Sequence, residues 1–235
     1  MSNTGVVFED RTFSGVHERR SGKISAGLEF RRCYFEGCGL SAVSHPRERT
    51  VVRNVRLIDC EERGCGVDAA ILENVIVDGL KTQGRLQTFG TVFKHVTLKG
   101  KIGTLMITPF VDLLGEAPEV QRAFDKANAN YYKNVDWALD ISEAQFLDCE
   151  FRTVPAGLIR RDPQTQVVVK RKKALSGIWR ELKYVKNTRW EPELHFFLEE
   201  GQADIVLVAP KRDRRFRQLV DGLKALRDAG VAEAD

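Results

Sequence analysis

The chain has 235 residues, of which 43% are hydrophobic and 30% are charged, so it can bury a substantial core. Its 37 basic and 33 acidic residues leave a net charge of only +4, which excludes a uniformly basic polyanion-binding protein, and any basic site must be local. No apolar run approaches the roughly 18 residues of a membrane span, and no signal peptide is recognised. We therefore expect a cytoplasmic protein with no membrane partner.

An internal repeat occupies the first half of the chain. Apolar residues recur at offsets 0, 3, 5 and 8, and successive segments follow one another at a nearly constant step, with one longer gap before the last. The first members of the segments are Phe8, Phe30, Val52, Leu72, Phe93 and Phe146. Such a step is typical of one coil of a parallel β-solenoid, whose equivalent side chains stack in columns. We therefore expect Phe35, Leu57, Val77 and Leu98 to form one column.

A small residue stands two positions before a large one in several of these segments. The pairs are Cys33/Phe35, Cys38/Leu40, Val55/Leu57, Val75/Val77 and Cys149/Phe151. This pattern resembles the pentapeptide-repeat family, whose five-residue unit points a small side chain and a Leu or Phe inward on each face of a right-handed quadrilateral β-helix. The resemblance covers about residues 5–103 and 140–160 and implies a fold, not an activity. A three-faced β-helix stays open as an alternative.

Polar residues follow the first member of most segments by two positions. They are Arg32, Asn54, Asn74, His95 and Asp148. Asn and Asp tolerate turn geometry, and their stacked side chains can satisfy one another, so the series predicts a ladder at a corner of each coil. A row of binding residues is the alternative.

A partly helical insertion is predicted at about residues 104–138, where the repeat breaks. Pro118 precedes apolar residues at helical spacing, which indicates a helix through Tyr131. Tyr131, Tyr132 and Trp137 make this segment the richest in candidate exposed aromatic residues, so we assign them to a binding surface. A lid over the flank of the solenoid is the alternative.

The C-terminal third has a different pattern and predicts an α+β cap. The expected elements are a turn at 161–164, a strand at 166–170, a helix over 175–185, a strand near 194–198, a strand at 204–208, and a helix from Phe216 ending near Gly230. The predicted fold is thus mainly β: a right-handed parallel β-helix at residues 1–160 with a helical insertion, closed by a cap at residues 161–235.

Two cysteine pairs, Cys33/Cys38 and Cys60/Cys65, have a spacing that four zinc ligands could use. Three of these four residues occupy the apolar positions of the repeat, so we expect buried thiols, with no metal and no cofactor. No phosphate loop, nucleophile elbow or metal signature is found, and no catalytic residue is assigned.

Basic residues cluster in the C-terminal third and form a second candidate binding surface. They are Arg160, Arg161, Lys170, Arg171, Lys172, Lys173, Arg214 and Arg215. They could converge on a nucleic-acid phosphate track, or they could simply face solvent.

The sequence therefore predicts a non-enzymatic scaffold that binds another protein. One concrete form is an immunity- or antitoxin-like protein that recognises a bacterial effector. Nucleic-acid binding through the basic clusters is the first alternative, and an enzyme with an unrecognised groove site is the second.

Overall fold

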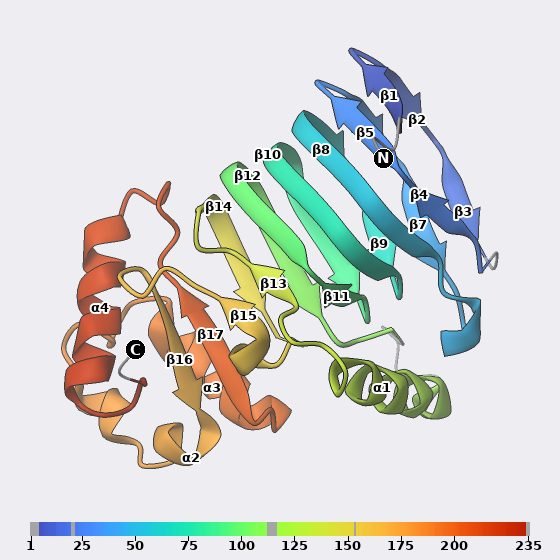
Figure 1. The fold of residues 1–235 in the computed structure, drawn as a ribbon. Coiled ribbons are helices and arrows are strands. Elements are labelled where there is room, and N and C mark those ends of the chain that lie inside the picture. Colours follow the sequence, from blue (N-terminus) through green and yellow to red (C-terminus); the bar gives the residue numbers. More distant parts are fainter. Residues whose placement is uncertain (1–4, 20–21, 112–116, 153, 234–235) are drawn as a thin grey trace.

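The computed structural model describes residues 5–19, 22–111, 117–152 and 154–233 (Figure 1). The protein is mainly β, with a strongly curled, all-parallel sheet followed by a smaller part that contains helices and a second sheet. No helix among the described residues is long and apolar enough to cross a membrane.

Within the described residues, the large sheet contains fifteen strands. Its longest series of neighbouring hydrogen-bonded strands is β1-β5-β8-β10-β12-β13-β15. Its first strands are β1 (Val6–Glu9), β2 (Thr12–Ser14), β3 (His17–Arg19), β4 (Ile24–Ala26), β5 (Leu28–Arg31), β6 (Tyr34–Glu36) and β7 (Gly39–Ala42). They are followed by β8 (Val51–Arg63), β9 (Gly66–Asp68), β10 (Ile71–Phe89), β11 (Val92–Lys94), β12 (Val96–Thr108), β13 (Leu139–Asp140), β14 (Ala144–Phe151) and β15 (Ile159–Arg160). A short 3₁₀ helix, η1 (Pro46–Glu48), separates β7 from β8, and another, η2 (Ala156–Leu158), precedes β15.

The predicted column of Leu57, Val77 and Leu98 is confirmed, because these residues are direct partners on β8, β10 and β12. Phe35 is not part of it, since its partner on β8 is Glu62. Phe30 pairs with Leu57 and not with Val52.

This shift arises from the segment that contains η1, because it lengthens the connection between β7 and β8. Phe8 pairs with Phe30, but the next partner in line is Leu57, which comes later in the chain than the expected Val52. The register thus moves by one five-residue unit at this point. Similarly, Phe146 pairs with Ile102 and not with the column of Phe93.

Phenylalanine rings fill the core beneath the first two turns of the chain. The rings of Phe8 and Phe30 stack with centroids 5.2 Å apart, and those of Phe13 and Phe35 do the same at 5.2 Å. Adjacent pairs meet edge to face, as between Phe8 and Phe13 at 5.5 Å. Parallel strands place equivalent positions of the repeat side by side. A phenylalanine at the same position in two successive segments therefore produces this stack of rings.

Residues with left-handed backbone conformation mark the bends of the sheet. Asn54, Asn74 and His95 have φ values of 55°, 54° and 56°, and they form the predicted corner ladder. Arg32 also has a positive φ but forms ion pairs with Glu9 and Asp10 instead.

Asp148, the last member of the predicted ladder, lies inside β14 and pairs with Thr104. Its inclusion was therefore wrong, because it followed from the misplaced register of Phe146.

The insertion contains helix α1 (Pro118–Tyr132), as predicted, with proline in its first turn. Its expected start at about residue 104 falls inside β12, which continues to Thr108. Phe124 of α1 is fully buried, with the Arg49 guanidinium over its ring. The helix also contacts the sheet through Tyr132, whose hydroxyl oxygen accepts the backbone N–H of Phe93. Figure 1 shows α1 beside the ends of the strands of the curled sheet.

The C-terminal part is built on two antiparallel strands, β16 (Gln166–Lys170) and β17 (Asp204–Val208), both at their predicted positions. Its helical elements are α2 (Arg171–Ala174), η3 (Ile178–Glu181), α3 (Trp190–Glu200) and α4 (Phe216–Asp228). The final helix and these two strands are thus confirmed.

Two predictions in this part were wrong. The strand expected near residues 194–198 is the second half of α3, whose buried residues Trp190, Leu194 and Phe197 follow helical spacing. The helix expected over 175–185 is broken, because Gly177 adopts φ 74° and only η3 follows it.

The small sheet joins the two parts of the core. Val168, Val206 and Val208 pack with the core of the curled sheet, whereas Val167 and Leu207 pack with the core beneath α3 and α4. Alternate residues of a strand point to opposite faces, which explains this division. The C-terminal part therefore covers the end of the curled sheet at β14 and β15 (Figure 1).

Candidate functional site

A chain of hydrogen-bonded polar side chains runs along one bend of the curled sheet. Asn74 donates an N–H to the side-chain oxygen of Asn54 at 3.2 Å, and His95 Nδ1 lies 3.2 Å from Asn74 Oδ1. His95 Nε2 in turn lies 2.6 Å from Asp136 Oδ1, in the segment that follows α1. The parallel register aligns the first three residues, and the end of the insertion brings the fourth to them.

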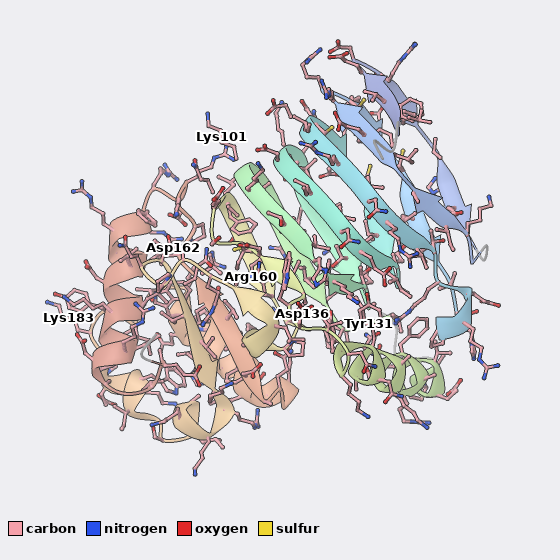
Figure 2. The ribbon with its side chains drawn as sticks, in the orientation of Figure 1. Lys101, Tyr131, Asp136, Arg160, Asp162 and Lys183 are labelled. Atoms are coloured by element: carbon pink, nitrogen blue, oxygen red, sulfur yellow. The ribbon has the colours of Figure 1, made fainter. Side chains whose placement is uncertain are left out.

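Trp137 is the aromatic centre of this bend, and we call Asn74, His95, Asp136, Trp137 and Arg160 the Trp137 corner. The Trp137 ring lies 4.7 Å from the His95 ring, and the Arg160 guanidinium carbon lies 4.1 Å from the Trp137 ring centroid. Figure 2 labels Arg160 on β15, at the junction of the curled sheet with the C-terminal part, and Asp136 in the segment that leads from α1 back to the sheet. Three segments that are distant in the sequence thus hold one half-buried tryptophan.

The electrostatics of the corner favour fixed positions for these groups. The hydrogen bond from His95 lowers the pKa of Asp136, so this carboxylate stays ionised beside the imidazole. Both ring nitrogens of His95 are occupied, by Asn74 and by Asp136. The arrangement therefore suits the positioning of Trp137 better than proton transfer to a substrate.

The aromatic residues of the insertion are less exposed than the sequence predicted. Tyr132 is only 8% exposed, and its hydroxyl oxygen accepts a hydrogen bond from the backbone N–H of Phe93 at 3.3 Å. Its assignment to an exposed surface was wrong, since α1 packs this side chain against the sheet.

Tyr131 is half-buried, and its hydroxyl lies 3.2 Å from a carboxylate oxygen of Glu73. Burial raises the pKa of Tyr131, and the charge of Glu73 raises it further. Of the three predicted aromatic residues, Trp137 is thus the best placed to contact a partner.

Several residues of the basic clusters are engaged within the chain. Lys170 forms ion pairs with Asp204 at 3.2 Å and with Glu233 at 3.8 Å. Arg171 donates to the backbone carbonyls of Phe197 and Leu198, near the C-terminal end of α3, where a cation is favourable. Both side chains thus contact groups of the chain itself.

The remaining basic residues do not form one surface. Lys172 and Lys173 are exposed at one end of the β16–β17 pair, whereas Arg214 and Arg215 are exposed at the other, because the strands are antiparallel. Arg215 also pairs with Asp213 at 3.4 Å.

Arg160 and Arg161 precede β16, and Arg160 belongs to the Trp137 corner while Arg161 is half-buried. The predicted basic residues thus separate into three places.

The five cysteines are free thiols, and Cys33, Cys60 and Cys149 are buried. Burial raises the pKa of Cys60 and Cys149, which disfavours the reactive thiolate. Within the described ranges, no three His, Cys, Asp or Glu side chains gather closely enough to hold a metal ion.

Sequence reasoning did not identify Asp136 as part of the corner. The available clue in the sequence was that Asp136 precedes Trp137. The contact between His95 and Asp136 could not be predicted, because the two residues are far apart along the chain.

No family model matches this sequence, and no curated protein matches it.

Proposed function

We propose that the curled sheet is a right-handed parallel β-helix of the kind found in pentapeptide-repeat proteins, with residues 161–235 as its cap. Three observations support this proposal: the recurrent spacing of strand partners along the chain, the stacked phenylalanine rings, and the repeated left-handed residues at the bends. Such a fold gives a rigid scaffold, because each turn is hydrogen-bonded to its neighbours.

We further propose that this scaffold is non-enzymatic and binds another protein through the Trp137 corner. The observation that carries the proposal is Trp137 itself, held between His95 and Arg160 at the surface. Tryptophan, arginine and tyrosine are the residue types that contribute most to protein interfaces. A side chain that is already ordered loses little entropy on binding, and this increases affinity.

Replacement of Trp137 by serine is expected to weaken strongly the capture of a stoichiometric partner from a lysate of the native organism. Hot-spot residues contribute about 2 kcal/mol or more, so we expect at least a roughly 30-fold loss of affinity. Arg160→Glu should act in the same direction. The matched control is Leu175→Ser, which changes an exposed apolar residue on the C-terminal part.

Equal capture by wild type and Trp137→Ser, with both proteins folded by circular dichroism, would reject the Trp137 corner as the binding surface. Identification of the captured protein tests the immunity- or antitoxin-like form of the proposal, because that form requires the partner to be a bacterial effector.

Nucleic-acid binding is expected to be absent or weak. A phosphate track needs neighbouring cations, whereas Lys172 and Lys173 lie at the opposite end of the β16–β17 pair from Arg214 and Arg215. Filter binding of a short DNA duplex at about 50 mM salt measures this. Retention that disappears in a Lys172→Glu/Lys173→Glu variant would favour a nucleic-acid-binding protein instead.

A further inference from the structure

A second surface feature, which we call the Asp68 hollow, lies where strands β7, β9 and β10 end. Its volume is about 420 Å³, and its apolar walls are supplied by Ala42, Val43, Ala69, Phe89 and Val111, with Ser44 also in the lining. Asp68 contributes a carboxylate. This volume lies within the range of about 300–1,000 Å³ that is usual for ligand sites.

The parallel register explains why a charge and an aromatic ring meet here. Asp68 is the last residue of β9 and Phe89 the last of β10, and the two are direct partners. Partners on adjacent parallel strands point to the same face of the sheet. The carboxylate and the ring therefore line the same hollow.

Asp68 has neither a hydrogen bond nor an ion pair with any other described side chain, although it is half-buried. Burial raises the pKa of its carboxyl group, because desolvation makes ionisation less favourable here than in water.

A buried cation on a neighbouring segment, Arg49, does not neutralise Asp68. Its guanidinium donates to the Gly90 carbonyl at 3.2 Å and to the Asn128 side-chain oxygen at 2.5 Å, and it lies over the Phe124 ring. The negative charge of Asp68 thus remains available to a partner.

We infer that the Asp68 hollow receives a lysine or arginine side chain of a protein partner. The charged end of that side chain would pair with Asp68 and lie near the Phe89 ring, which attracts cations. Its methylene groups would pack against Ala42, Val43 and Ala69, as long basic side chains do on apolar surfaces. The inference rests on the proposed function, because it names a recognition element of the bound protein.

The test is an NMR titration of the full chain with Nα-acetyl-arginine methylamide and Nα-acetyl-lysine methylamide. We expect shifts of the Ala69 and Phe89 amides with millimolar affinity, and none with Nα-acetyl-norleucine methylamide, which has a similar length but no charge. Asp68→Asn should weaken binding at least tenfold. Asp221→Asn, which removes an exposed carboxylate from α4, should leave it unchanged.

Misfolding will not imitate this result, because Asp68→Asn removes an unfavourable charge and should raise the melting temperature at neutral pH. Phe89→Leu preserves apolar volume and should weaken binding several-fold. Equal binding by wild type and Asp68→Asn, or shifts confined to other regions, overturns the inference.

The titration uses model compounds, so it does not depend on the natural partner. Failure of the titration together with Trp137-dependent capture of a partner rejects the Asp68 hollow alone. Capture that survives Trp137→Ser, together with a positive titration, rejects the Trp137 corner alone.

Discussion

Replacement of Trp190 by alanine is expected to lower the free energy of unfolding by about 3–5 kcal/mol. Trp190 is fully buried at the start of α3, and its Nε1–H donates to the Leu219 carbonyl of α4 at 3.0 Å. The substitution would leave a cavity between the two helices and remove that hydrogen bond. Chemical denaturation followed by circular dichroism measures the change, since the variant loses the fluorescence of Trp190.

Two companion variants separate the causes of this loss. Trp190→Phe retains most of the packing and should cost less than the alanine variant. Gly222→Ala should also destabilise, because a Cβ atom at Gly222 would lie 2.5 Å from the Trp190 ring and 2.7 Å from the Tyr184 carbonyl oxygen. A loss below about 1 kcal/mol in Trp190→Ala would contradict the packing of α3 against α4 described above.

The repeat in the sequence was sufficient to predict a sheet built from stacked segments, but not its register throughout. Its apolar pattern has the same three-residue spacing at offsets 0 and 3 as at offsets 5 and 8. A shift by one five-residue unit therefore matches almost as well, and only the length of the loop at η1 decides it. This is why Phe30 pairs with Leu57, although Val52 lies at the expected distance.

The candidate sites were harder to predict because they depend on contacts across the insertion. Trp137 was selected for its residue type, but its neighbours His95 and Arg160 are determined by where α1 returns the chain to the sheet. Asp68 gave no signal in the sequence, because a single carboxylate at the end of a strand is ordinary until its surroundings are known.

The mistaken strand near residues 194–198 has a different cause. Leu194, Phe197 and Leu198 lie in a short apolar run that fits either a strand or a buried helix. Phe196 is 52% exposed and faces away from the core. In the sequence it extends the apolar run, which favoured the interpretation as a strand.

Substitution of Glu62 by glutamine is expected to stabilise the protein by about 1–3 kcal/mol above neutral pH. Glu62 is 4% exposed and lies between its partners Phe35 and Thr82 in the sheet. One of its carboxylate oxygens accepts the Cys65 backbone N–H at 3.1 Å, and the other has no hydrogen-bond partner. Burial therefore raises the pKa of Glu62 above that of the unfolded chain.

The sign of the pH dependence follows from that shift. The protonated carboxyl is favoured in the folded state, so Glu62 does not destabilise the fold below its unfolded pKa of about 4.3. As the pH rises through the folded pKa, the wild type loses stability that Glu62→Gln retains. The difference in unfolding free energy should therefore be near zero below the unfolded pKa, grow as the pH rises toward the folded pKa, and stay constant above it.

Denaturant titrations of both proteins across this pH range measure the difference. Glu143→Gln, at an exposed position, serves as the control and should follow the wild-type profile. The side-chain oxygen of glutamine can still accept the Cys65 backbone N–H, whereas methionine has no such acceptor. Glu62→Met should therefore stabilise the protein less than Glu62→Gln. If the glutamine variant is less stable than the wild type above neutral pH, the fold stabilises the ionised form of Glu62. The buried charge of Glu62 would then not reduce the stability of the protein.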